Sequence, residues 1–215
     1  MSSDREDLRA RLRAAIPRGY SPAFHFAFPS VVGLGCAVAA LLLIRGLRPL
    51  ELLTVPAVFL LSNMVEWRAH RDLLHKRQRP LEVLYDRHTP EHHRVFVTDD
   101  MAIRDARELR LVLIPAYGIL AVLVAAAPGP VGLALAGLPN VALLWLATAM
   151  AYVVAYEWLH LAYHLPADSF IGRRRLVARL RHHHAVHHDP RLMQRWNFNV
   201  TFPIWDWVRG TTYPG

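Results

Sequence analysis

Apolar and polar residues are segregated into long blocks along the chain. The first apolar block runs from about Phe26 to Ile44, and a helix of that length covers roughly 28 Å, close to the thickness of a bilayer core. A second run, Leu50 to Val65, is short for a span but continues into a helical-looking polar stretch. Two further runs lie at about Leu111–Ala127 and Val141–Tyr156. The pattern predicts an all-α integral membrane protein with about four transmembrane helices in two hairpins.

Two weaker segments complete the pattern. Residues 128–139, PGPVGLALAGLP, are apolar but rich in proline and glycine, which predicts a tight or re-entrant connection between the last two spans. Residues 4–16 place Leu8 and Leu12 near one side of a helix, which favours a helix lying on the membrane surface, with a solvated leader as the alternative. No linker-like stretch divides the chain, so we expect a single domain over residues 1–215, of which 1–22 form the amphipathic N-terminal segment.

Charge predicts the orientation. The chain carries a formal net charge of +8 and has a pI near 10.3. Five Lys and Arg residues precede the first span, ten lie between the second and third, and eight follow the fourth, whereas the opposite ends carry only Arg45 and Arg48. The positive-inside rule places both termini and the polar segments in the cytoplasm. Topology explains the basic excess, so nucleic acid is not an expected partner.

Histidines form the chemical signal. Ten of the thirteen fall into four groups with short, helix-compatible spacings, whereas the only cysteine, Cys36, lies in an apolar run. Neutral imidazole is a common ligand of iron, zinc and copper, and ten ligands are too many for one ion. The pattern predicts a cytoplasmic helical cap carrying a dimetal site with these ligands: His70, His75, His88, His92, His93, His160, His164, His184, His187 and His188.

The helical period predicts which histidines point together. Residues three or four apart share a face, so we expect His160 with His164, His184 with His187 and His188, and His88 with His92. His93 points off from the last pair by about 100°. The chain also contains a weak internal echo, in which each half supplies a Glu-Trp pair, spaced histidines and a doubled histidine. This echo predicts two half-sites. Three carboxylates are candidates to orient ligands, to bind metal, or to pair with arginines instead: Glu66, Glu157 and Asp189.

With these motifs the sequence resembles the superfamily of fatty acid hydroxylases and sterol desaturases, which are integral-membrane, histidine-rich di-iron oxygenases. HRDLLH, HLAYH and HAVHH match its motifs, whereas HTPEHH, from His88 to His93, has one residue more than usual. The tail from Asn197 to Thr211 is also similar, and the resemblance covers about residues 60–211. On a regular helix the extra residue rotates His88 by about 100°, which leaves another donor as an alternative there.

The resemblance implies two Fe ions, with zinc able to occupy such sites in isolated protein, and O2 as co-substrate. It implies hydroxylation of a C–H bond of a membrane lipid of fatty acyl, sterol or carotenoid type, with desaturation at the same site as the alternative. Electrons would come from an external donor of the ferredoxin, cytochrome or reductase type, since the chain has no G-x-G-x-x-G fingerprint. A basic run could receive an acidic donor, although topology explains the same residues: Arg173, Arg174, Arg175, Arg179 and Arg181.

Two other classes compete. A membrane metal-binding or transport protein would place ligands along a path through its spans, whereas here they follow the predicted spans. A carboxylate-rich di-iron site needs two E-x-x-H motifs, and the chain has one, from Glu157 to His160.

Overall fold

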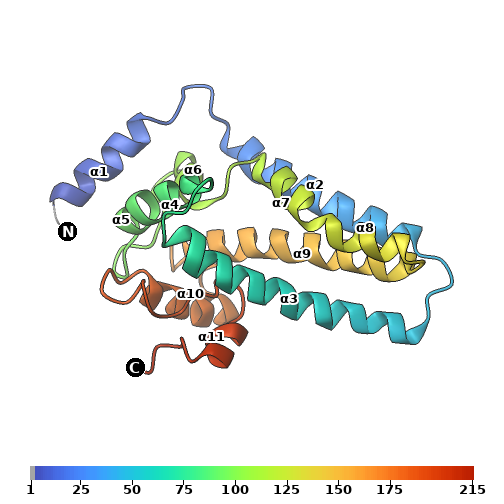
Figure 1. The fold of residues 1–215 in the computed structure, drawn as a ribbon. Helices are drawn as coiled ribbons and strands as arrows, with labels where there is room; N and C mark the ends of the chain where they lie inside the picture. The colour runs from blue at the N-terminus through green and yellow to red at the C-terminus, as the bar shows by residue number, and fades with distance from the viewer. Residues whose placement is uncertain (1–2) are drawn as a thin grey trace. The chain divides into compact units, whose positions relative to one another are not determined.

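The computed structural model describes residues 3–215, and all regular elements in that range are helices (Figure 1). Contacts divide the chain into two compact units. We call residues 23–62 and 114–157 the apolar unit, and residues 3–22, 63–113 and 158–215 the histidine unit. Helices α3 and α9 each contribute residues to both.

The apolar unit consists of helices that run alongside one another (Figure 1). They are α2 (Pro22–Leu43), the first part of α3 (Thr54–Ala69), α7 (Gly118–Ala126), α8 (Pro128–Leu135) and most of α9 (Pro139–Tyr163). Its core uses small residues, among them Ala37, Ala40 and Ala147, which allow close helix packing.

Four helical stretches are long and apolar enough to cross a membrane, as predicted. They are Pro22–Leu43, Pro49–Leu74, Gly118–Leu135 and Pro139–Tyr163. Their outer faces carry exposed aliphatic side chains, such as Leu42 at 71% and Leu135 at 85% exposure. A surface of this kind is expected of an integral membrane protein, whose outer residues contact lipid.

The predicted third span was wrong at both ends. The helix containing Leu111 is only the short α6 (Leu109–Val112), because the backbone becomes extended at Leu113 and Pro115 follows. Proline disfavours a helical conformation in the residue before it and cannot donate a backbone hydrogen bond. The span therefore begins anew at Gly118.

The proline-rich segment that we expected to form a connection is instead helix α8. Pro128 lies in its first turn, where a backbone N–H is not needed. Gly129 lies under the Trp145 indole, and a Cβ there would come within 2.9 Å of the ring. The turn follows at Gly137, which has a φ of +78°.

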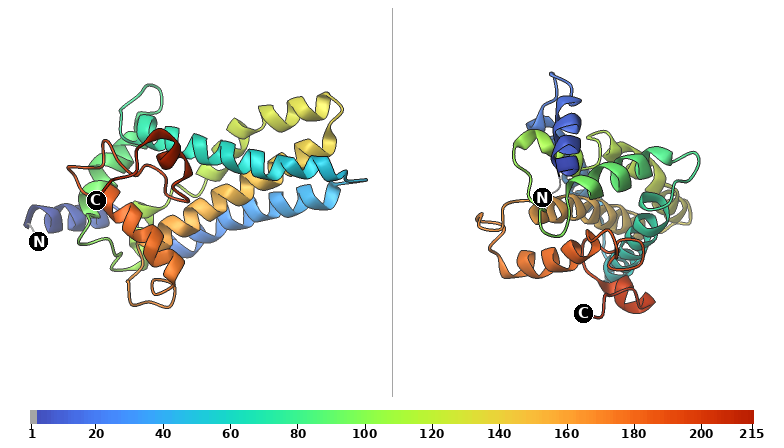
Figure 2. Two further views of the ribbon diagram at one scale, coloured as in Figure 1. Left: turned by 90° about the horizontal axis from the view of Figure 1, so that it is seen from below. Right: turned by 90° about the vertical axis from the view of Figure 1, so that its left-hand side faces the viewer.

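The histidine unit contains the other α-helices of the part that the structure describes. They are α1 (Ser3–Ala14), α4 (Glu82–Arg87), α5 (His93–Val95), α6, α10 (Arg175–His187) and α11 (Ile204–Arg209). Figure 2 shows α10 and the C-terminal coil that leads to α11.

Helix α1 packs against protein on the side that we expected to face a membrane surface. Leu8 and Leu12 contact a buried cluster that includes Phe96 and Leu111. Arg9, on the same helix, is only 2% exposed and forms an ion pair with the fully buried Glu108. The helix is therefore a packed element of the histidine unit, neither a solvated leader nor a helix with a free apolar face.

Candidate metal centre

All ten predicted histidines come together in the histidine unit, and each is less than 10% exposed. They form two groups in which the potential ligand nitrogens lie within 4.8 Å of one another. The first group is His70, His75, His88, His93 and His187. The second group is His92, His160, His164, His184 and His188.

Two π-helical turns position the first group. They cover His70–Leu74, at the end of α3, and His88–His92, which follows α4. A π turn closes hydrogen bonds between residues five apart instead of four. This geometry brings His75 back beside His70, with ring centroids 5.1 Å apart, and His93 beside His88, at 4.6 Å. The additional residue of HTPEHH is thus absorbed by a π turn, and His88 lies in the first group.

Regular α-helical spacing positions the second group. His160 and His164, at the end of α9, have ring centroids 5.0 Å apart, and His184 and His188, on α10, are 4.5 Å apart. Both pairs are four residues apart and share a helix face, as predicted.

The doubled histidines connect the two groups. The His88 and His92 rings stack at 5.3 Å, as their spacing predicts, but His92 lies in the second group, and it is His93 that shares the first group with His88. His187 likewise lies in the first group while His188 lies in the second, so the expected pairing of His184 is confirmed for His188 and wrong for His187. Each half of the chain therefore supplies four ligands to its own group and one to the other, which refines the predicted half-sites.

Backbone carbonyls orient half of the rings. In each of these five histidines Nδ1 lies 2.5–2.8 Å from a carbonyl oxygen, so Nδ1 carries the hydrogen and Nε2 presents a lone pair toward its group. The pairs are His70 with Phe198, His92 with Leu111, His164 with Met101, His187 with Trp196, and His188 with Phe96.

One contact in the first group is informative about charge. The Nε2 atoms of His75 and His187 lie 2.9 Å apart. The His187 hydrogen is used at Trp196. The Thr89 hydroxyl donates to Leu74, so it accepts from Nδ1 of His75 at 3.2 Å, and Nε2 of His75 is again a lone pair. Burial lowers the pKa of His75 to about 2 and that of His187 well below its ordinary value, so no proton bridges the two lone pairs. A cation between them would satisfy both.

The second group gives the same indication. The Nε2 atoms of His92 and His164 are buried and have no hydrogen-bond partner among the residues that the structure describes. Burial lowers the pKa of His92 to about 4, although its bond to Leu111 favours the proton. Buried polar atoms are normally satisfied, so two inward lone pairs of this kind fit ligands of a metal ion.

Distances between nitrogens also fit metal ligation. The closest Nε2 pairs in the two groups are 2.9–3.0 Å apart, at His70–His88, His75–His187, His88–His93 and His184–His188. Two imidazoles about 2.1 Å from one ion and at right angles would lie about 3.0 Å apart, whereas a tetrahedral angle would separate them by about 3.4 Å. These close pairs are therefore near enough for two imidazoles to bind one ion.

Each of the three carboxylate candidates accepts a hydrogen bond from the backbone. Glu66 accepts hydrogen bonds from the backbone of Val200 and from the backbone and hydroxyl of Thr201, and so anchors the C-terminal coil. Asp189 accepts from the backbone and guanidinium of Arg191, at 2.6–3.0 Å. For this carboxylate the structure therefore shows the predicted alternative, a pair with an arginine. Glu157, in the apolar unit, accepts from the backbone N–H of Ile114 at 3.2 Å.

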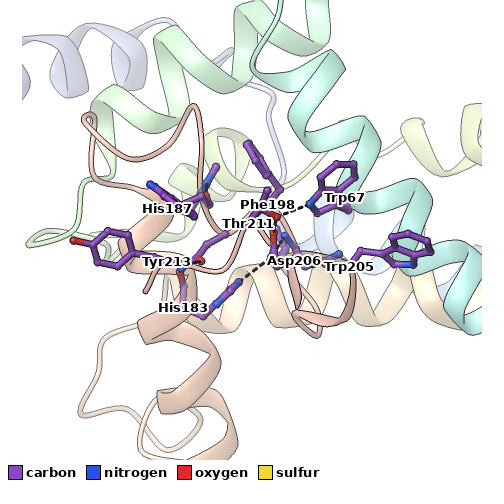
Figure 3. Close-up of polar contacts among 12 residues, drawn as sticks. Trp67, His183, His187, Phe198, Trp205, Asp206, Thr211 and Tyr213 are labelled. Carbon is purple, nitrogen blue, oxygen red and sulfur yellow. Dashed lines mark hydrogen bonds and ion pairs between the residues drawn. The ribbon is translucent and has the colours of Figure 1, made fainter. Parts of the chain in front are cut away.

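The network around Asp206 was not predicted from the sequence (Figure 3). This carboxylate is fully buried and accepts hydrogen bonds from the Phe198 backbone at 2.9 Å, the Thr211 hydroxyl at 2.7 Å and the His183 ring at 3.1 Å. Burial alone would raise the pKa of Asp206, but these bonds hold it below the ordinary value. The only sequence signal was an acidic residue inside the aromatic stretch IWDW.

The four apolar helices and the buried polyhistidine groups define a membrane protein of metal-binding type. Residues 55–211, well over half of the chain, match the fatty acid hydroxylase family. The chain belongs to this family, whose members are generally oxidoreductases. No curated protein and no solved structure matches the chain significantly.

Proposed function

We propose that the protein is an O2-dependent, di-iron membrane oxygenase that hydroxylates a C–H bond of a lipid. Family membership supports the reaction class, and the facing lone pairs of His75 and His187 carry the argument for metal. In this proposal the first group of histidines holds one iron ion and the second group the other. The five imidazoles of each group would hold the ion, and imidazole-rich ligation suits iron.

The histidine unit provides what iron chemistry requires of a protein. Bound iron would supply the oxygen activation needed to attack an unactivated C–H bond, which acid–base side chains do not provide. The backbone carbonyls of Phe198 and Trp196 hold the Nδ1 protons of His70 and His187, so both rings stay neutral and aimed inward. Burial of all ten rings excludes bulk water from the centre.

The proposal includes the predicted topology and partners. The distribution of Lys and Arg supports a cytoplasmic location for both termini and for the histidine unit. The electron donor would be an external ferredoxin, cytochrome or reductase that approaches from that side. Of the arginines expected to receive it, Arg181 is held by hydrogen bonds that it donates to the backbone carbonyls of Ala162 and Leu165.

Lipid mass spectrometry on cells that express the protein tests the reaction. Gain of one oxygen in a membrane lipid supports hydroxylation, and loss of two hydrogens would replace it with desaturation. The double variant His184→Ala, His187→Ala removes one ligand from each group and should abolish the product, whereas His182→Ala, on an exposed residue outside both groups, is the matched control.

Metal analysis after anaerobic purification tests the cofactor separately. We expect two iron ions per chain in the wild type. Fewer than one ion per chain would contradict a dinuclear centre, and metal bound without any lipid product would favour the metal-binding or transport alternative.

A further inference from the structure

The two histidine groups take their orienting carbonyls from different segments of the chain. Those of the first group come from the C-terminal coil, where Trp196 and Phe198 accept from His187 and His70. Those of the second group come from residues 96–111, where Phe96, Met101 and Leu111 accept from His188, His164 and His92. Neither segment supplies a carbonyl to the other group among these five bonds.

Asp206 holds the C-terminal coil in place (Figure 3). Its carboxylate accepts from the backbone N–H groups of Phe198 at 2.9 Å and Asn199 at 2.8 Å. The Thr211 hydroxyl donates to it at 2.7 Å and itself accepts from the Trp67 indole at 3.0 Å. The Phe198 carbonyl that binds His70 and the Asn199 N–H that binds Asp206 belong to the same peptide group, so this carboxylate fixes the peptide that orients the ring.

Arg9 and Glu108 hold the other segment. The Arg9 guanidinium donates to Glu108 at 2.9 and 2.5 Å and to the carbonyl of Ala102 at 2.7 Å, next to Met101. It also lies over the Phe96 ring, 5.3 Å from the centroid. Glu108 accepts in addition from the backbone of Arg104 at 2.9 Å. This buried ion pair thus ties helix α1 to the segment that orients the second group.

We propose that Asp206 and the Arg9–Glu108 pair are positioning residues for separate metal sites, Asp206 for the first group and Arg9–Glu108 for the second. The two sites are then loaded and lost independently, and helix α1 serves only one of them. This inference rests on the proposed function, because it requires each group to hold a metal ion.

The experiment measures Co2+ binding to metal-free protein in detergent by calorimetry and by the absorption of the bound ion. Two backgrounds isolate the sites: His75→Ala, His93→Ala disables the first, and His160→Ala, His164→Ala disables the second. Asp206→Asn and Glu108→Gln are introduced into each. Loss of an outer-shell partner typically weakens metal binding 10- to 100-fold.

Asp206→Asn should weaken the first site 10- to 100-fold and leave the second within about twofold, and Glu108→Gln should do the reverse. Normal affinity at the undisturbed site also shows that the variant is folded. Thr211→Val and Thr211→Ser are a matched pair: the valine should weaken only the first site, and the serine, which retains the hydroxyl, should bind as the wild type does.

Three outcomes would overturn the inference. Asp206→Asn or Glu108→Gln could weaken both sites alike, as general misfolding would, or could weaken neither. The third outcome is a wild type that binds fewer than two Co2+ ions, which would remove the proposed dimetal function and the inference together. The first two leave wild-type binding intact, so they contradict the inference alone.

Discussion

The metal-free histidine unit should be acid-labile. Burial lowers the pKa of eight histidines outside the candidate spans, to about 2 for His75 and about 4 for His92. The others, lowered well below the ordinary value, are His88, His93, His164, His184, His187 and His188. In the unfolded chain the same rings titrate near 6.5, so below that pH the unfolded state binds more protons.

The magnitude follows from this difference. The free energy of unfolding is highest above pH 6.5 and decreases as pH falls, because the unfolded state binds protons that the folded state does not bind. At pH 5.5 each such ring lowers the free energy of unfolding by about 1.4 kcal/mol. Eight rings together lower it by about 11 kcal/mol at most, which is as large as the whole stability of a typical domain, roughly 5–15 kcal/mol.

The assay follows unfolding of chelator-treated protein in detergent between pH 8 and pH 5, by circular dichroism and by tryptophan fluorescence, to which Trp67 and Trp196 of the histidine unit contribute. We expect cooperative loss of the histidine unit between about pH 6 and pH 5.5. Added metal should move the transition to lower pH, since it binds only the folded form. His182→Gln, at an exposed position, is the matched control and should leave the profile unchanged. Equal stability of the metal-free protein at pH 7.5 and pH 5.5 would refute the reasoning.

Two further predictions concern the apolar unit and the surface of the histidine unit. Gly33→Ala should lower thermal stability by about 1–3 kcal/mol, because its Cβ would come within 2.5 Å of Val154, whereas Gly35→Ala, with nothing within 4 Å, should be neutral or slightly stabilising; equal effects in a melting experiment would argue against this helix contact. Asp189→Ala should keep both metal ions and change stability by less than about 1 kcal/mol, because its carboxylate pairs with the exposed Arg191; loss of metal would restore Asp189 as part of the centre.

The spans and the ligands were predictable because their signals are local. Four hydrophobic runs predicted four helices, and the histidine spacings predicted all ten members of the two groups. The predicted bounds of the third span were wrong because the sequence letters do not distinguish a proline that ends a helix from one that begins a helix. Pro115 is of the first kind and Pro128 is of the second. Only the position of each relative to the helix end distinguishes them.

The parts of the site that escaped prediction depend on distant partners. The π turns at His70 and His88 change the spacing from four to five, and the motif letters alone do not show which hydrogen bonds close. The carbonyls that orient the rings belong to the backbone, which is the same in every residue. Phe198 and Trp196 therefore look like ordinary apolar residues of the tail in the sequence. Asp206 is connected to Trp67 by way of Thr211, and Trp67 and Thr211 are 144 residues apart in the sequence, a contact that no periodicity reveals.

The doubled histidines set the separation of the two groups. His92 and His93 are neighbours in the chain but point about 100° apart, with ring centroids 5.4 Å apart, and His187 and His188 repeat the arrangement at 6.2 Å. Each pair places one ring in either group, so two peptide bonds hold the groups together from opposite halves of the chain. His93 and His188, one from each group, stack at 4.2 Å, which leaves no room for an intervening side chain. Separating the two groups would therefore require the backbone to change conformation at both doubled histidines. Because each half of the chain gives one ligand to the other group, the backbone itself keeps the two groups close.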